Sequence, residues 1–465
     1  MVFGSTFGTM NAAYAADATV DTAVTADAAI TEGGTTITFD GNADDTLTMT
    51  AAQAEVFLGA VTTVVTERGS LAFVGQAGAA PFVTTFNAAV GTSALTLNAI
   101  TIGTAAVGGA VTFDSNVFAV TTTLVGGDHA NEVATGTFKG DLTSAIVLTE
   151  GSIGVVTANF TGTVDQTITG ATTASTTGDG AIVVNNTTGK KVTFASNIGV
   201  AAGAKVKSVT VSAAKTAEFQ GAVSSLNATL AAGSITTFLN NGHVIGTGNA
   251  GALTFGGTNT VINIGRGVVA GETLFTTTAS DAGVGGVVIT ATTINLPSNF
   301  STGIIKLIDD DTEVVSDDEL ALLTLTNTPL TSFVATKTDT DFDVSITATA
   351  KSDATTASEL GVNTNKATGL RAAVLAAATQ GTDTTLIDAF TTVLNAGTTT
   401  DTDVANQVAP QTDTISGSAV ATRAMTGTVQ GIVSNRMASL RSGDAYVTGM
   451  SAGNGMSANS GFIQA

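Results

Sequence analysis

Val111-Thr112-Phe113-Asp114-Ser115 is followed 25 positions later by Gly136-Thr137-Phe138-Lys139-Gly140. Both segments place a phenylalanine directly after a threonine and continue into polar or small turn residues. Related segments recur along the body of the chain: Ile37-Thr38-Phe39-Asp40-Gly41, Asn159-Phe160-Thr161-Gly162, Val192-Thr193-Phe194-Ala195-Ser196, Ala217-Glu218-Phe219-Gln220-Gly221 and Leu253-Thr254-Phe255-Gly256-Gly257. This repetition predicts many short strands separated by tight turns.

The spacing of the phenylalanines indicates how these strands are arranged. Phe194 and Phe219 are also 25 positions apart, Phe138 and Phe160 are 22 apart, and other gaps are irregular. Units of about 20 to 25 residues are typical of β-solenoid coils, each of which buries its inner face only against its neighbours. We therefore expect a mainly β chain in which residues 16–350 form a right-handed parallel β-helix. An array of β-sandwiches is the alternative.

The composition favours an elongated repetitive fold. Only 11% of the residues are charged and 43% are hydrophobic, against roughly 25% charged in an average globular protein. Few charges and few large side chains make a layered globular core hard to build. In a solenoid, the asparagines expected at coil corners, Asn116, Asn197 and Asn259, are predicted to form ladders from coil to coil.

The charge balance excludes one class of partner. The chain has 16 Lys and Arg against 37 Asp and Glu, a formal net charge of −21. Such a chain repels nucleic-acid phosphates, so no nucleic-acid partner is expected. Cysteine is absent, which excludes disulfides, thiolate catalysis and cysteine-based metal sites.

The N-terminus has one feature of an exported protein. Ala13 and Ala15 form a small-x-small pattern of the kind that a signal peptidase cleaves. No Lys or Arg occurs before Arg68, so the positive region of a signal peptide is missing. Residues 1–15 are therefore interpreted as the remnant of a truncated signal peptide.

An acidic run is the strongest candidate for a metal site in the sequence. It extends from Asp309 to Glu319, and Asp309, Asp310 and Asp311 are consecutive carboxylates of the kind that bind Ca²⁺. The run lacks the spacing of an EF-hand loop and the repeats of calcium-binding β-rolls. A solvated loop is therefore expected, with these three residues as a weak calcium candidate.

Two motifs match catalytic or nucleotide-binding patterns in form only. Gly246 to Gly251 fits G-x-G-x-x-G, but the following segment from Ala252 to Phe255 has the pattern of a strand and not of a phosphate-binding helix. Gly449 to Gly453 fits G-x-S-x-G without a histidine downstream. His129 and His243 lie far apart in the sequence, and each is expected in a turn. We predict no catalytic residues, no cofactor and no enzymatic activity.

The C-terminal region changes to helical periodicity. Apolar residues recur at helical spacing in 370–378, 386–394 and 418–441. The last segment has 24 residues, about 36 Å at 1.5 Å per residue, which is enough to thread the roughly 25 Å apolar band of an outer-membrane barrel. The residues of this segment assigned to a pore-linker helix are Ile432, Val433, Arg436, Met437, Leu440 and Arg441.

The order of these segments resembles the junction between passenger and translocator in bacterial autotransporters, the type V secretion proteins. The resemblance rests on the Asn363-to-Ala378 and Leu386-to-Leu394 helices, on Val408-Ala409-Pro410, and on Arg436-Met437-Ala438-Ser439-Leu440-Arg441. It covers about the last 105 residues. The stretch from Pro297 to Ile308 is similar, more weakly, to surface antigens of rickettsia-like alphaproteobacteria.

This resemblance implies a domain order and a location. Residues 351–441 would be a helical junction and pore linker, and 442–465, with Gly461-Phe462-Ile463-Gln464-Ala465, the start of a truncated translocator barrel. The chain would be exported through the periplasm and be secreted or held at the outer membrane and cell surface. Its partners would be its own or a separate outer-membrane β-barrel and an extracellular surface or glycan ligand.

The functions that follow are those of a surface protein. We expect a non-enzymatic passenger acting as an adhesin, a surface shield or a surface-layer component. One alternative is a β-helix hydrolase or lyase acting on polysaccharide, which needs carboxylates grouped along one groove. The other is a free fibre or filament subunit, which needs an end that supports assembly.

Overall fold

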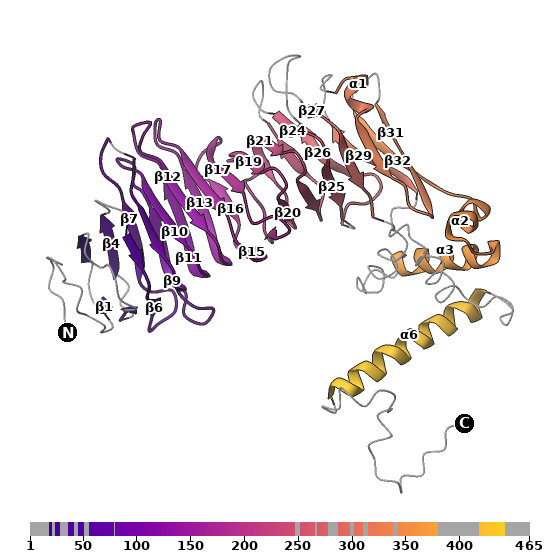
Figure 1. The fold of residues 1–465 in the computed structure, drawn as a ribbon, viewed down its shortest axis with the longest axis horizontal. Coiled ribbons are helices and arrows are strands. Elements are labelled where there is room, and N and C mark those ends of the chain that lie inside the picture. Colours follow the sequence, from indigo (N-terminus) through magenta and orange to yellow (C-terminus); the bar gives the residue numbers. More distant parts are fainter. Residues whose placement is uncertain are drawn as a thin grey trace, which may run out of the picture. The chain divides into compact units, whose positions relative to one another are not determined.

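The computed structural model describes residues 18–20, 24–27, 36–40, 45–50, 55–78, 80–246, 252–265, 267–277, 287–297, 302–309, 315–337, 343–379 and 418–441. Within them the chain is mainly β, and its strands stack in sequence order into a parallel β-solenoid (Figure 1). Strands of successive coils pair in parallel, which confirms the solenoid. The sheets of a β-sandwich would instead be antiparallel.

Two long sheets and one short sheet make up the solenoid. The 15-stranded sheet contains β5 (Glu55–Phe57), β8 (Val83–Phe86), β10 (Gly109–Phe113), β12 (Ala134–Phe138), β14 (Val156–Phe160), β17 (Asp179–Val184), β19 (Val206–Val211), β21 (Ser224–Leu230), β23 (His243–Ile245), β24 (Ala252–Phe255), β26 (Thr273–Thr277), β27 (Val287–Ile289), β29 (Gly303–Asp309), β31 (Thr331–Lys337) and β32 (Val344–Ala350). The strands β29 and β32 pair antiparallel, and the strand pairs from β5 to β29 are parallel. We refer to it as sheet B.

The 14-stranded sheet, sheet A, contains β2 (Val24–Asp27), β4 (Thr46–Thr50), β7 (Ser70–Val74), β9 (Leu97–Ile102), β11 (Val117–Val125), β13 (Leu142–Thr149), β15 (Gln166–Ile168), β16 (Thr172–Ala174), β18 (Lys191–Phe194), β20 (Thr216–Phe219), β22 (Ile235–Phe238), β25 (Thr260–Ile264), β28 (Thr292–Asn295) and β30 (Leu323–Thr326). The short third sheet contains β1 (Ala18–Val20), β3 (Ile37–Phe39) and β6 (Val61–Thr63). Isolated bridges from Val61 to Val90 and on to Val117 continue that third side.

Alternation along each strand separates an inner face from an outer face. In β13 buried and half-buried residues alternate over all eight positions. Because side chains in a strand point alternately to opposite faces, each strand places every second residue in the core. Parallel pairing then stacks like on like, as where Phe113 pairs with Phe138.

The stacked phenylalanines form a ladder through the core. In sheet B, Phe86, Phe113, Phe138 and Phe160 stack with ring centroids 5.5 to 5.6 Å apart. The stack continues in sheet A through Phe194, Phe219 and Phe238, with centroid distances of 5.3 and 5.4 Å. An edge-to-face contact of 5.2 Å between Phe160 and Phe194 joins the two halves. Each pair adds about 0.5 to 1.5 kcal/mol beyond the area it buries.

The corner asparagines bond to the next coil in a different way from the one predicted. The Oδ1 atom of Asn116 accepts the backbone N–H of Asp141, and that of Asn197 accepts the backbone N–H of Ala222, each at 2.9 Å. These amides therefore cap neighbouring backbone groups instead of bonding to one another. Asn259 adopts a left-handed conformation with φ of 63°. An amide-to-amide bond does occur on the outer face of sheet A, where Asn295 Nδ2 donates to Asn263 Oδ1 at 2.8 Å.

The chain divides into two compact units. One comprises residues 1–327 and 333–348, and the other comprises 328–332 and 349–465. The first contains the solenoid and the short helix α1 (Asp317–Leu320), which is closed by a capping box between Ser316 and Glu319. The acidic run is therefore partly helical. Its carboxylates in the first turn of α1 interact favourably with the helix dipole.

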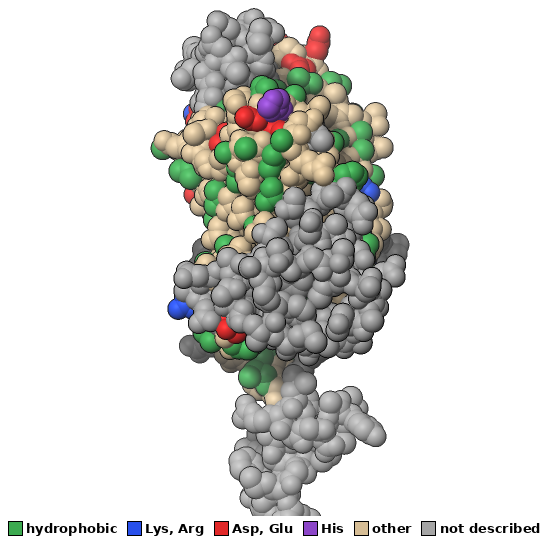
Figure 2. Space-filling model, turned by 90° about the vertical axis from the view of Figure 1, so that its left-hand side faces the viewer, with side chains coloured by type: hydrophobic (Ala, Val, Ile, Leu, Met, Phe, Trp, Pro, Cys, Tyr) green, Lys and Arg blue, Asp and Glu red, His purple; other side chains and the backbone are tan. Residues whose placement is uncertain are grey.

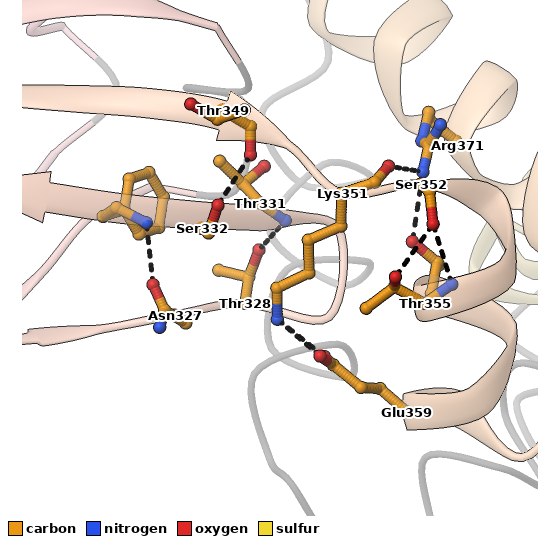
Figure 3. Close-up of polar contacts among 12 residues, drawn as sticks. Asn327, Thr328, Thr331, Ser332, Thr349, Lys351, Ser352, Thr355, Glu359 and Arg371 are labelled. Carbon is orange, nitrogen blue, oxygen red and sulfur yellow. Dashed lines mark hydrogen bonds and ion pairs between the residues drawn. The ribbon is translucent and has the colours of Figure 1, made fainter.

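The second unit contains α2 (Asp353–Leu360), α3 (Thr364–Thr379) and α6 (Ser418–Arg441). Figure 3 shows how α2 begins: the Ser352 side chain accepts the backbone N–H of Thr355 at 3.1 Å. It ends at Gly361, whose φ of 64° suits a residue without Cβ. Lys351 pairs with Glu359 at 2.7 Å (Figure 3). Among the described residues, no helix has the length and apolar character needed to cross a membrane.

Candidate functional site

The outer face of sheet B presents two aligned columns of small, uncharged side chains. We call this surface the threonine face. Its first column contains Thr85, Thr112, Thr137, Asn159, Val183, Thr210, Thr229 and Thr254. Its second column contains Ala110, Thr135, Thr157, Ala181, Ser208, Asn227 and Ala252.

The sequence positions these side chains outward. In β12 the residues on either side of Thr137 are Gly136 and Phe138, and both are buried. Thr137 is half-buried and faces away from the core, as does Thr135 two positions earlier. Neighbouring members of one column lie about 4.8 Å apart, and the two columns lie about 6.6 Å apart along the strands.

Charged groups lie outside the two columns and border them: Lys207, which pairs with Glu150 at 3.0 Å, directly precedes Ser208 in β19, and Lys306 is in β29 of the same sheet. Lys139 pairs with Asp114 at 2.8 Å just beyond the ends of β10 and β12. Lys191 pairs with Glu218 at 2.6 Å on sheet A. Figure 2 views the molecule from the left-hand side of Figure 1, and among the described side chains on that side the red and blue ones are few. The threonine face therefore combines regular spacing with an absence of formal charge within both columns.

This arrangement allows binding and offers no group for acid–base catalysis. Threonine and serine hydroxyls and asparagine amides donate and accept hydrogen bonds without titrating near neutral pH. A general acid or base needs a group that exchanges protons at the working pH, such as a carboxyl or an imidazole. The two columns contain neither.

The structure places the two histidines in opposite environments. His243 is fully buried at the start of β23, so the prediction that it lies in a turn is wrong. Its Nδ1 accepts the Val223 N–H and its Nε2 lies 2.9 Å from the Asn240 carbonyl oxygen. Burial lowers the pKa of His243 to about 4, so the ring is neutral at neutral pH. It makes an edge-to-face contact with Phe238 and is part of the core.

His129 lies in an exposed turn, as predicted. Its Nδ1 lies 2.7 Å from Asp128 Oδ1 and 3.3 Å from Glu132 Oε2. The hydrogen bond and negative charge of Asp128, followed by those of Glu132, raise the pKa of His129. Hydrogen bonds from backbone N–H groups, first of all that of Gly78, lower the pKa of the Glu132 carboxyl. The sequence did not reveal this grouping, although Asp128-His129 and Glu132 stand within five positions.

Lys205 is a buried basic residue. Only 5% of it is exposed, and its Nζ donates to the carbonyl oxygen of Gly246. Burial lowers the pKa of this lysine. A lysine buried against a carbonyl, with no carboxylate bonded to it among the contacts of the described residues, weakens the fold more than it supports it.

The weak calcium candidate is only partly within the described residues. Asp309 ends β29, where its Oδ1 lies 3.5 Å from the Nζ of Lys306. That ammonium also pairs with Asp343 at 2.7 Å, and the Asp343 carboxylate raises the pKa of Lys306. A cation beside Asp309 disfavours Ca²⁺ there. Asp310 and Asp311 lie outside the described residues.

The predicted pore-linker helix coincides with α6. Ile432, Val433 and Met437 are 61%, 48% and 54% exposed. The side chains of Arg436, Leu440 and Arg441 lie outside the described set. Also outside it are residues 1–15, the predicted helix 386–394, the G-x-S-x-G match and 442–465. The segment after the G-x-G-x-x-G match is strand β24, as predicted.

Comparison with protein-family models, with curated proteins and with solved structures found no match.

Proposed function

We propose that this chain is an exported, non-enzymatic passenger of the autotransporter type, a right-handed solenoid acting as an adhesin, surface shield or surface-layer component. The observation that carries the proposal is the threonine face. A rigid stack of coils presenting a repeated, uncharged, hydroxyl-lined surface suits contact with an extended neutral ligand. The extracellular glycan is the ligand class we assign to it.

The non-enzymatic part of the proposal follows from the chemistry of the threonine face. Glycosidic bond cleavage requires a pair of carboxyl groups about 5 to 9.5 Å apart across a bound sugar. Neither column of the face contains Asp or Glu. A ligand bound along Thr112, Thr137 and Thr210 would be held by hydrogen bonds and would dissociate without being cleaved.

The helix α6 supports the second element of the proposal, a pore linker that engages an outer-membrane β-barrel. Its exposed apolar residues Ile432, Val433 and Met437 leave hydrophobic surface in contact with water, which a partner would cover favourably. A barrel interior is one such partner, and the location proposed for the chain is the outer membrane, the cell surface or the secreted fraction.

The ligand proposal is tested on an array of immobilised glycans, both neutral and sulfated. We expect binding to neutral glycans and none to sulfated ones, because the net charge of −21 repels anions. The double variant Thr137→Glu, Thr210→Glu should lose binding. The matched control Thr123→Glu, Thr143→Glu places the same two charges on the outer face of sheet A and should bind normally. Equal losses in both variants, or release of sugar from any glycan, would contradict the proposal.

The export proposal is tested by joining residues 1–465 to the translocator barrel of an autotransporter in a Gram-negative host. Surface display is measured as cleavage of the passenger by protease added to whole cells. Replacing residues 418–441 with a Gly/Ser segment of equal length should abolish display, whereas Thr123→Glu should not. Unchanged display after the replacement would remove the role given to α6.

A further inference from the structure

The turn between β11 and β12 brings three potential metal ligands together. Asp128, His129 and Glu132 each offer a ligand atom, and these atoms all lie within 4.8 Å of one another. His129 and Asp128 are exposed, whereas the Glu132 side chain is completely buried. Figure 2 shows a histidine side chain on the molecular surface with acidic side chains beside it.

Glu132 is a buried carboxylate that is held firmly in place. Its Oε1 accepts the N–H of Gly78 at 2.5 Å, and its Oε2 accepts the backbone N–H of His129 at 3.0 Å. Gly127 lies against this carboxylate: a Cβ at that position would stand 2.5 Å from Oε2. The carboxylate is therefore oriented before any ligand arrives, which is what a metal site requires of its ligands.

The charge on Glu132 makes a divalent cation a suitable further partner. A buried carboxylate is stable when it is paired with a cation. Glu132 forms an ion pair with His129, whose ring is 66% exposed. A divalent ion would neutralise both Glu132 and Asp128, and a half-exposed imidazole does not.

One of the ligand–ligand distances matches a small tetrahedral ion. With metal–ligand bonds of about 2.0 Å, adjacent ligands of a tetrahedral site are about 3.3 Å apart. Glu132 Oε2 and His129 Nδ1 are 3.3 Å apart. Asp128 Oδ1 is closer to the imidazole, at 2.7 Å, and because its side chain is exposed it is free to open by the small amount required.

We propose that Asp128, His129 and Glu132 bind one divalent transition-metal ion of the Zn²⁺ class, with water completing the coordination. An imidazole ligand and low coordination number favour such an ion over Ca²⁺ or Mg²⁺, which take mainly oxygen ligands in larger number. The ion holds the β11–β12 turn to the Gly78 loop, which precedes it by 54 positions. The site is independent of the threonine face and of the function proposed for it.

The test is calorimetric titration of the metal-stripped full chain with ZnCl₂ at pH 7.5. We expect one equivalent to bind, and His129→Gln to weaken binding at least about tenfold, because even loss of a partner beyond the direct ligands costs that much. Asp128→Asn is a second variant whose exposed position carries no folding risk, and it should weaken binding as well. Asp317→Asn, an exposed acidic residue in α1, is the matched control and should bind like the wild type.

Cobalt gives a second readout of the same site. Co²⁺ in a low-coordinate site with an imidazole ligand has visible absorption that changes with its ligands, so the wild type should show a band that His129→Gln lacks. His243 remains in every variant and controls for unspecific histidine binding. No Zn²⁺ binding by the wild type, or equal binding by wild type and His129→Gln, would overturn the proposal. An excess of CaCl₂ that displaced Zn²⁺ would do the same.

Discussion

His243 should make a separate, measurable contribution to the destabilisation of this protein by acid. The pKa of its ring is about 4 in the folded chain, against about 6.5 in an unfolded chain. Between these values the unfolded state binds a proton that the folded state does not. Stability from the neutral ring is therefore fully present above pH 6.5 and is lost as the pH falls toward 4.

The size of the effect follows from the two pKa values. The full difference of about 2.5 pH units corresponds to about 3.4 kcal/mol, and about 2.5 kcal/mol of it is lost between pH 7.5 and pH 4.5. Because all 37 carboxylates also titrate in acid, the wild type alone does not isolate this contribution. The variant His243→Gln removes the titrating ring and leaves the carboxylates unchanged.

The assay is urea unfolding followed by far-UV circular dichroism, since the chain has no tryptophan. Between pH 7.5 and pH 4.5 the wild type should lose about 2.5 kcal/mol more unfolding free energy than His243→Gln. The control His129→Gln should change the pH dependence of the unfolding free energy in the opposite direction. The pKa of His129 is raised in the folded chain, so the stability that this residue contributes is present at low pH and lost as the pH rises. If wild type and His243→Gln lost the same free energy on acidification, the assignment of a buried neutral ring would be wrong.

Three further predictions concern the core and the coil corners. Phe138→Ala should cost about 3 to 5 kcal/mol of unfolding free energy because it interrupts the ring stack, whereas its outward neighbour Thr137→Ala should cost less than about 0.5 kcal/mol. Gly140→Ala should cost about 1 to 3 kcal/mol, because the added Cβ would stand 2.6 Å from the Oδ1 of Asn116; wild-type stability would refute this contact. Lys205→Met should remove a pH dependence of stability, because burial lowers the pKa of Lys205. In urea unfolding, the wild type should gain stability relative to the variant as the pH rises toward 10. Parallel pH profiles of the two proteins would contradict this prediction.

The repeating part of the fold was predictable from the sequence because the physical rule behind it is local. Alternation of apolar and polar residues assigns each side chain of a strand to the core or the surface. The 25-residue spacing of Phe113 and Phe138 then requires the two rings to lie in the same place in successive coils. For the same reason the strand nature of Ala252 to Phe255 was visible without any tertiary information.

The positions of the titratable groups were not predictable, because they depend on contacts between distant segments. His129 follows Asp128 and His243 follows Gly242, both of them residues that favour turns, and yet His129 is exposed and His243 is buried against Phe238 and Phe275. Glu132 is oriented by the N–H of Gly78, from a loop that no sequence pattern links to it. The composition of the acidic run suggested a cation site. In the structure the ammonium of Lys306, which pairs with Asp343, also lies beside Asp309 and makes it a poor metal ligand.

The sequence by itself determined short alternating strands with an inner phenylalanine row and favoured parallel coils over an array of β-sandwiches, since period and alternation act over neighbouring residues. Only the tertiary structure decided that the strands pair in parallel, which sheet holds each part of that row, which outward side chains align in uncharged columns, and which histidine meets two carboxylates. These features depend on the strand register and the turns of many coils together. Small shifts in register add up along the stack, and no single repeat encodes their sum.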